Sequence, residues 1–176
     1  SEWVECCNKM DQVIVPSTFT KNVLKRSGML KTPVVVVQEW FNTGITNNSK
    51  IGKALSDERY KKIKEGFNIL LIGTLTSQIP EDDRKNLFNT LKWLCEEFKD
   101  DKDVNILLKT NVGKGTTKDK EMTKEYLTSF IKNFKKTEYP KINLIHGVLK
   151  PNEINALYAH PKVKLYVSAT RGEGYG

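Results

Sequence analysis

Asn68-Ile-Leu-Leu-Ile-Gly73 is an apolar run that ends on a glycine. Further along the chain, Asn105-Ile-Leu-Leu-Lys109 is a second apolar run that also begins with Asn-Ile-Leu-Leu. Such runs do not alternate apolar with polar residues, so they are typical of parallel strands that are buried on both faces. Four more short segments complete the set of predicted strands: Val13-Ile-Val-Pro-Ser17, Val34-Val-Val-Val-Gln38, Ile142-Asn-Leu-Ile-His146 and Lys164-Leu-Tyr-Val-Ser168.

Amphipathic helices are predicted between these strands, because apolar residues recur there at helical spacing. One stripe contains Leu87, Leu91, Leu94 and Phe98, and another contains Met122, Leu127, Phe130, Ile131 and Phe134. Strands that alternate with helices of this length predict an α/β fold, a Rossmann-like, parallel, doubly wound sheet.

Local signals place several helix ends. Ser17 is expected to cap a helix that runs to about Ser27, with Gly28 after it. Asp83 is expected to be the N-cap of the helix that carries the first stripe, and Pro151 is expected to begin a short helix. Residues 42–66 are polar and irregular, with a short lysine-rich helix predicted from Ser56 to Gly66, so they are interpreted as a linker before a new first strand.

The composition limits the classes of protein. A net charge of +8 suggests nucleic acid as a partner, but only four of the 29 basic residues are arginines, and the lysines are interleaved with acids. We therefore interpret most of this charge as a solvated surface. The chain has no apolar run long enough to span a membrane, no signal-peptide pattern and three cysteines without a C-x-x-C pair, which favours a cytoplasmic location with reduced thiols.

Common catalytic motifs are absent from the sequence. No strand is followed by G-x-G-x-x-G, and Gly113-Lys-Gly-Thr-Thr lacks the spacing of a P-loop. No triad pattern or metal-ligand cluster is recognisable, so we predict neither a metal nor a cofactor. His146 is interpreted as a packed or hydrogen-bonded histidine.

Two segments remain as candidates for binding. Arg84 and Lys85 lie at the start of a predicted helix, where cations are disfavoured by the helix dipole, and this is a hint of an anionic ligand. Glu173 lies between Gly172 and Gly174, after the last strand, at the end of the sheet where ligands bind in open α/β folds. The simpler alternative for Arg84 and Lys85 is that both side chains face solvent, and for Gly172–Gly174 it is an ordinary surface turn. Lys109, at the end of a predicted strand, is a further candidate for binding.

Taken in order, these segments resemble the retaining glycosyltransferases of the two-domain GT-B fold, especially glycosyltransferase family 4. The resemblance covers nearly the whole chain. It rests on Asp11-Gln-Val-Ile-Val-Pro-Ser17, Val34–Phe41, Ile69-Leu-Leu-Ile-Gly73, Asp83-Arg-Lys-Asn86, Leu144-Ile-His-Gly-Val148 and Arg171-Gly-Glu-Gly-Tyr-Gly176. It implies that residues 1–41 are the tail of the acceptor-side domain, that 42–66 are the linker, and that 67–176 are part of the nucleotide-sugar-binding domain.

The resemblance also implies roles for residues. Lys85, with Arg84 beside it, would stabilise the charge that builds on the diphosphate leaving group. Glu173, with Gly174 beside it, would orient the donor sugar, while backbone groups near Val148 and Leu149 would meet the base.

Gly73 and Thr74 would flank the phosphates. The family usually has an arginine where this chain has Thr74, and the sequence leaves open whether Arg84 replaces it.

The implied substrates are a nucleoside-diphosphate sugar and an acceptor of unknown kind. The family's second glutamate would fall past Gly176, so we expect these residues to be a fragment that transfers no sugar alone and is prone to self-association. The alternative is a basic Rossmann-like binding module without catalysis, which would contact nucleic acid.

Overall fold

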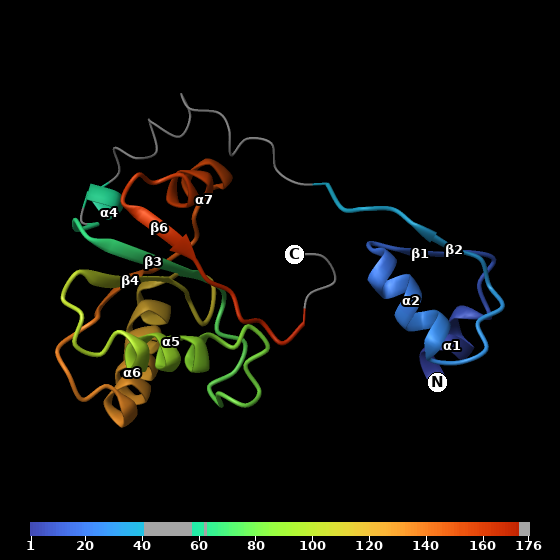
Figure 1. The fold of residues 1–176 in the computed structure, drawn as a ribbon, viewed down its shortest axis with the longest axis horizontal. Helices are drawn as coiled ribbons and strands as arrows, with labels where there is room; N and C mark the ends of the chain where they lie inside the picture. The colour runs from blue at the N-terminus through green and yellow to red at the C-terminus, as the bar shows by residue number, and fades with distance from the viewer. Residues whose placement is uncertain (41–57, 62, 173–176) are drawn as a thin grey trace. The chain divides into compact units, whose positions relative to one another are not determined.

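The structure is a computed structural model, and it describes residues 1–40, 58–61 and 63–172. The chain is divided into two compact units (Figure 1). The first contains Ser1–Asn42, and the second is Thr43–Arg171. The elements of each unit are described separately below.

The first unit pairs two short parallel strands with two helices. Its elements, in chain order, are α1 (Glu2–Cys7), β1 (Val13–Val15), α2 (Thr18–Arg26) and β2 (Val34–Val36). The predicted cap is confirmed, because the backbone N–H of Thr20 donates to Ser17 Oγ at 3.1 Å and Ser27 is the C-cap of α2.

The second unit contains a four-stranded sheet in which every neighbouring pair is parallel. Its strands are β3 (Phe67–Ile72), β4 (Val104–Lys109), β5 (Lys141–Ile145) and β6 (Val163–Tyr166), arranged in the order β5-β4-β3-β6. Each of the six strands predicted from the sequence is therefore present. The strand order reverses between β3 and β6, since the chain runs from β3 outward to β5 and then returns to the other side of β3.

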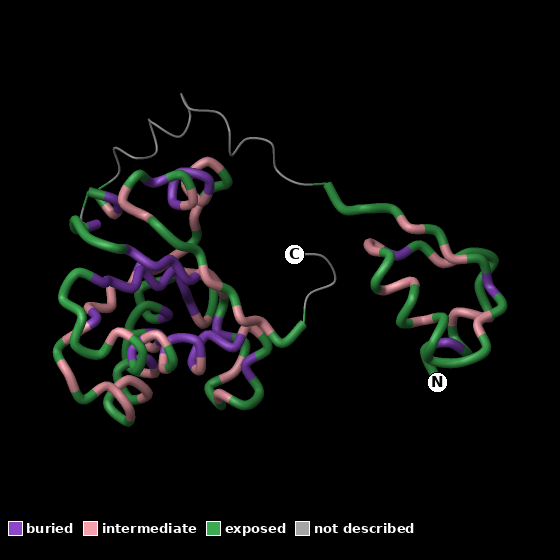
Figure 2. The backbone as a smooth tube through the Cα atoms, viewed as in Figure 1, coloured by how far each residue is buried: buried purple, intermediate pink, exposed green. Residues whose placement is uncertain are grey.

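Helices cover both faces of this sheet (Figure 1). Leu71, Ile106 and Leu108 pack with residues of α5 (Leu87–Glu97) and α6 (Thr117–Phe134). The alternate residues Leu70 and Leu107 pack with residues of α4 (Glu58–Lys61) and α7 (Pro151–Tyr158). Figure 2 shows that burial is concentrated in β3 and β4, as expected for strands covered on both faces. The prediction of an α/β, Rossmann-like, doubly wound sheet is confirmed.

One predicted helix was too long. Residues 63–66 of the segment Ser56–Gly66 are not helical, and 56, 57 and 62 lie outside the described residues. The backbone turns instead at Gly66, whose φ is +116°, and the Asn68 side chain donates to the carbonyls of Lys64 and Gly66 at 3.0 and 3.3 Å. β3 begins directly after this turn, at Phe67.

Among the described helices, none is both long and apolar enough to cross a membrane.

Candidate functional site

Four loops follow the carboxyl ends of the parallel strands β3, β4, β5 and β6. They run from Gly73 to Asn86, from Thr110 to Thr116, from His146 to Lys150 and from Val167 to Gly172. In an open α/β sheet, ligands bind at this end of the strands, and especially where the strand order reverses. Here that place lies between the loop after β3 and the loop after β6.

The loop after β3 is built around Asp83, whose side chain is fully buried. Its Oδ1 accepts from the hydroxyl of Thr76 at 2.8 Å, and its Oδ2 accepts from the backbone N–H of Leu87 at 2.8 Å. The sequence-based assignment of Asp83 as the N-cap is wrong, because Asn86 holds that position, with a left-handed φ of 53°. The carboxylate reaches the first helical amide from inside the preceding turn, so Asp83 still supplies the hydrogen bond that a cap would supply.

This turn fixes the backbone that carries the predicted cations. The N–H of Arg84 donates to Thr76 Oγ1 at 3.0 Å, and the Arg84 side chain is exposed, while Lys85 is half-buried. The backbone position of Arg84 is thus fixed by a hydrogen bond within the turn that Asp83 organises, and Lys85 follows it directly.

The loop after β6 is hydrogen-bonded to the same turn. Arg171 N–H donates to the carbonyl of Arg84 at 3.0 Å, and its guanidinium donates to the carbonyl of Pro80 at 3.0 Å. The Asn86 side chain donates to the carbonyl of Ala169 at 3.0 Å. The structure therefore brings together the segment of Arg84 and Lys85 and the segment that leads into Gly172. Glu173 and Gly174 lie outside the described residues.

Gly73 and Thr74 begin the loop after β3. A Cβ added at Gly73 would lie 3.1 Å from a methyl group of Leu87, so close packing against α5 already accounts for this glycine. Thr74 is exposed. The predicted phosphate contacts of both residues stay predictions.

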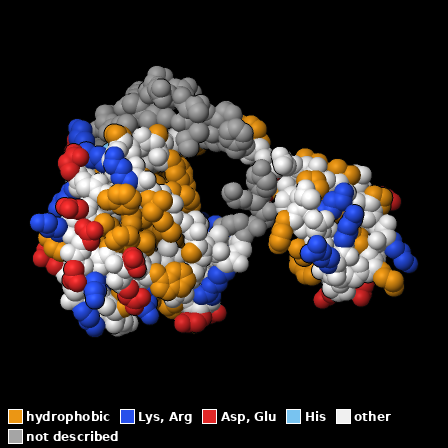
Figure 3. All heavy atoms as spheres, in the orientation of Figure 1, with side chains coloured by type: hydrophobic (Ala, Val, Ile, Leu, Met, Phe, Trp, Pro, Cys, Tyr) orange, Lys and Arg blue, Asp and Glu red, His pale blue; other side chains and the backbone are white. Residues whose placement is uncertain are grey.

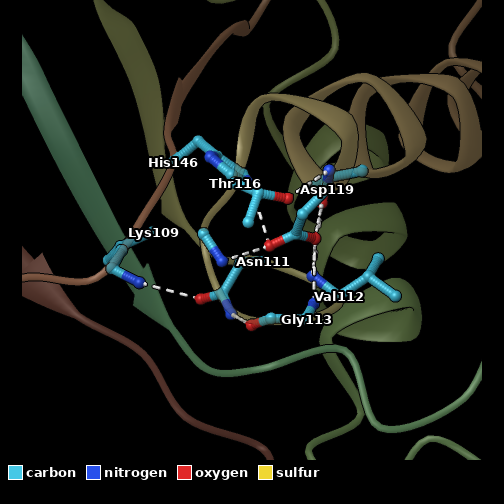
Figure 4. A network of polar contacts seen from close by, with 9 residues as sticks. Lys109, Asn111, Val112, Gly113, Thr116, Asp119 and His146 are labelled. Carbon is cyan, nitrogen blue, oxygen red and sulfur yellow. Dashed lines mark hydrogen bonds and ion pairs between the residues drawn. The ribbon is translucent and has the colours of Figure 1, made fainter.

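Lys109 ends β4 and is only 8% exposed. Its Nζ donates to Asn111 Oδ1 at 3.2 Å (Figure 4). Burial lowers the pKa of this ammonium group, and the nearby charge of Asp119 offsets part of that effect. Lys109 is thus held within the loop after β4 rather than extended into solvent.

Asp119, which the sequence analysis missed, organises that loop (Figure 4). Its Oδ1 accepts from the backbone N–H groups of Val112 and Gly113 at 3.1 and 2.8 Å, and its Oδ2 accepts from the N–H of Gly115 at 2.6 Å. Burial acts to raise the pKa of this carboxyl, but the hydrogen bonds from the backbone outweigh it and hold the pKa below its usual value.

A local signal could have revealed this role. Thr116 is the N-cap of α6, and its hydroxyl accepts from the N–H of Asp119 at 3.2 Å. The pattern Thr-x-x-Asp directly after Gly-Lys-Gly resembles a capping box, in which the acidic side chain turns back toward the preceding loop.

The loop after β4 also touches the loop after β5. Gly115 has a φ of +80°, and a Cβ added there would lie 3.0 Å from the backbone nitrogen of Val148. The Val148 side chain is 73% exposed, whereas Leu149 packs against the core beside α7. The contact of the Val148 and Leu149 backbone with a base stays a prediction. The structure places the Val148 backbone against Gly115 in the loop after β4.

His146 is packed, as expected. Its side chain is 6% exposed, and Nε2 lies 3.4 Å from Asp119 Oδ2. Burial lowers the pKa of this imidazole, and the charge of Asp119 opposes that shift. Within the part of the chain that the structure describes, no three His, Cys, Asp or Glu residues are grouped closely enough to hold a metal ion.

Comparison with known proteins gives matches at the level of structure. No family model matches the sequence, and no curated protein matches it. A UDP-forming α,α-trehalose-phosphate synthase from Burkholderia vietnamiensis superimposes with a TM-score of 0.64 at 10% identity, over 99% of this chain and 42% of that chain. The chain has the fold of part of a GT-B protein.

Two further solved structures agree with this fold. The enzyme of the same name from Burkholderia xenovorans, in complex with glucose-6-phosphate, gives a TM-score of 0.62 at 10% identity, over 99% of this chain and 44% of that chain. A trehalose-6-phosphate synthase studied with bisubstrate glycomimetics gives 0.57 at 9% identity, over 99% and 43%. The chain thus spans less than half the length of the proteins it resembles.

Proposed function

We propose that this chain comprises the tail of the acceptor-side domain and part of the donor-binding domain of a glycosyltransferase, and that the parent protein moves a sugar from a nucleoside-diphosphate sugar to an acceptor with retention of configuration. One observation carries the proposal. The turn of Arg84 and Lys85 is hydrogen-bonded to the segment of Ala169–Arg171, where the strand order reverses between β3 and β6. That reversal is the usual ligand site of such sheets.

The chemistry of transfer fits the residues at this place. Cleavage of the bond between the sugar and the diphosphate leaves negative charge on the leaving group, and fixed cations stabilise that charge more in the transition state than in the ground state. Lys85 and Arg84 take this role in the proposal. Glu173, with Gly174 beside it, lies two residues after Arg171 in the sequence and takes the role of orienting the donor sugar.

Calorimetric titration of the chain with UDP, ADP and GDP tests this proposal. We expect at least one of them to bind, and the double variant Arg84→Ala with Lys85→Ala to weaken that binding about tenfold or more, because charge-assisted hydrogen bonds to phosphate are lost. Lys132→Ala with Lys136→Ala removes the same charge from exposed positions and should leave the affinity unchanged. Equal affinity in both double variants would sink the proposal.

Titration with a single-stranded RNA, beside the nucleoside diphosphates, tests the alternative of a nucleic-acid-binding module. On the face of the second unit drawn in Figure 3, basic and acidic side chains are interspersed rather than gathered into one basic stripe. Binding of a single-stranded RNA with steep loss of affinity in added salt, and no binding of nucleoside diphosphates, would favour that module instead.

A further inference from the structure

A hollow of about 450 Å³ opens between the loop after β3, the loop after β4 and the helix α6. It is lined by Leu75, Thr76, Ser77, Gln78, Ile79, Val112 and Tyr126. Six of these residues follow the carboxyl ends of β3 and β4, the end of an open α/β sheet at which ligands bind. None of the described residues proposed for the donor is among them, and the volume lies within the range of small-molecule pockets.

The apolar part of the lining is held in place by the core. Leu75 is buried in the cluster that packs with α5 and α6, and its N–H donates to the carbonyl of Asn111 at 3.1 Å. This hydrogen bond ties the loop after β3 to the loop after β4. Val112 packs against the same cluster, and Ile79 is 55% exposed. A ligand in the hollow would therefore contact fixed hydrocarbon surface.

The lining carries no charge. No Asp, Glu, Lys, Arg or His is among the described residues that line the hollow, although 28% of the residues of the chain are charged. A phosphate, carboxylate or ammonium group would lose part of its hydration on entry and would find no counter-ion. The lining therefore favours a neutral ligand.

Two accessible side chains provide hydrogen-bonding groups beside each other. Nε2 of Gln78, which is exposed, donates to the hydroxyl of Tyr126, which is half-buried, at 2.6 Å. Gln78 Oε1 accepts no hydrogen bond from a described residue, and the Tyr126 hydroxyl donates to none. Ser77 Oγ accepts from the N–H of Ile79 at 3.1 Å, and its own hydrogen is a second available donor. An acceptor and two donors thus remain for a ligand.

A sugar ring matches this combination of groups. Each hydroxyl of a saccharide both donates and accepts, so neighbouring hydroxyls pair with an acceptor and a donor that lie together. The C–H faces of the ring are apolar and pack on aliphatic and aromatic side chains such as Leu75 and Tyr126. A hydrocarbon ligand would cover Gln78 Oε1 and the two hydroxyls without pairing them, which is costly.

We propose that the hollow between the loop after β3 and α6 binds a neutral saccharide. Gln78 and Tyr126 bond to neighbouring hydroxyls of the sugar, and Ser77 donates to a third oxygen. The hollow adjoins the turn that carries Arg84, because Thr76 lines it and its hydroxyl accepts from the N–H of Arg84 at 3.0 Å. The proposal does not depend on the proposed donor site, since no part of it requires a nucleotide.

NMR titration of the 176-residue chain with maltose, cellobiose and lactose tests the proposal. We expect at least one of these disaccharides to shift the side-chain amide signals of Gln78, with a dissociation constant of about 10 mM or below. Cyclohexanol and inorganic phosphate at the same concentration should not shift them, because cyclohexanol has no neighbouring hydroxyls and phosphate is charged. No shift with any of the disaccharides at about 50 mM, or an equal response to cyclohexanol, would overturn the proposal.

Matched variants locate the site, with the backbone amide signals of residues 75–79 as the readout. Gln78→Ala and Tyr126→Phe should each weaken the disaccharide about fivefold or more, because each removes one hydrogen-bonding group. Gln12→Ala and Tyr139→Phe make the same changes away from the hollow and should leave the affinity unchanged. Gln78 and Gln12 are both exposed, so these two variants retain the fold. Equal affinities in Gln78→Ala and Gln12→Ala, or full displacement of the disaccharide by UDP, would overturn the assignment to this hollow.

Discussion

Asp119 fixes a glycine-containing loop by satisfying three of its backbone N–H groups. A carboxylate that is only 7% exposed is favourable here because each oxygen accepts at least one of these hydrogen bonds. Gly115, in the same loop, then lies against the backbone of Val148. One side chain thus sets the distance between the loops that follow β4 and β5.

Asp119→Asn should destabilise the chain at neutral pH, because an amide NH₂ replaces one acceptor oxygen and leaves a buried N–H unpaired. The pKa of Asp119 is lowered in the folded state, so its stabilising effect is present above the unfolded pKa, about 3.9, and is lost as the pH falls through the lower folded value. We expect a melting temperature several degrees below that of the wild type at pH 7, and a difference that shrinks toward pH 2.

Thermal melts at a series of pH values measure this effect. Asp100→Asn, at an exposed position, removes the same charge and serves as the control. A difference between Asp119→Asn and the wild type that stays constant from pH 7 to pH 2 would contradict the hydrogen-bonding role.

The roles of single residues were the least predictable part of this molecule. Arg84 and Lys85 stand out in the sequence because cations at a helix start conflict with the helix dipole, and their role in binding stays a prediction. Asp119 was missed because its partners are backbone groups, which leave no pattern of side chains in the sequence. Asp83 was assigned to the right helix but to the wrong position, since only the structure reveals that Asn86 adopts a left-handed backbone.

At the scale of elements, the turn from Thr76 to Asn86 is held in shape by its own internal hydrogen bonds. Asp83 links Thr76 to the first amide of α5, and Arg171 links the turn to the loop after β6. The basic residues of the proposed donor site are carried on this unit, so its order determines where their charges lie.

Asp83→Ala should therefore cost about 2 kcal/mol of unfolding free energy, because it removes a capping interaction and leaves buried donors without acceptors. Asp82→Ala is the matched control, since Asp82 is adjacent but exposed, and it should change stability little. Urea denaturation followed by circular dichroism measures both values. Similar losses in the two variants would mean that the buried carboxylate does not organise the turn.

The strands and the long helices were predictable because burial dictates their pattern. A strand covered on both faces needs a continuous apolar run, as in β3 and β4, and a helix that packs on one face needs an apolar stripe, as in α5. The length of the short helix within the predicted linker was not predictable. The backbone leaves the helical region before β3, where the Asn68 side chain bonds the carbonyls of Lys64 and Gly66.

At the scale of the whole molecule, the sheet explains how distant segments of the sequence become neighbours. The chain leaves β3, passes through β4 and β5, and returns as β6 on the other side of β3. Residues near Arg84 and Arg171 thereby meet at one end of the sheet. The alternation of strands and helices predicts the sheet, but the hydrogen bonds between those two loops depend on backbone carbonyls that the sequence does not distinguish.

The two units differ greatly in what they bury. Side chains of β3 and β4 such as Ile69, Leu70 and Ile106 have no exposed surface, whereas Val4 and Val15 are the buried apolar side chains among the described residues of the first unit. Large apolar side chains there, including Trp3 and Phe19, are mostly exposed. A unit of this size with so little buried apolar surface has little stability of its own.

Hydrogen exchange of the 176-residue chain tests this difference directly. Backbone amides of β1 and β2 are expected to exchange at least about a hundredfold faster than those of β3 and β4, because local opening of the first unit disrupts few buried contacts. Peptides that cover residues 13–37, 67–75 and 104–110, measured by mass spectrometry over seconds to hours, separate the two classes. The α2 amides are an internal check, since they belong to the first unit and should exchange with β1 and β2. Protection of β1 and β2 equal to that of β3 and β4 would mean that the first unit is stabilised by something other than its own buried side chains.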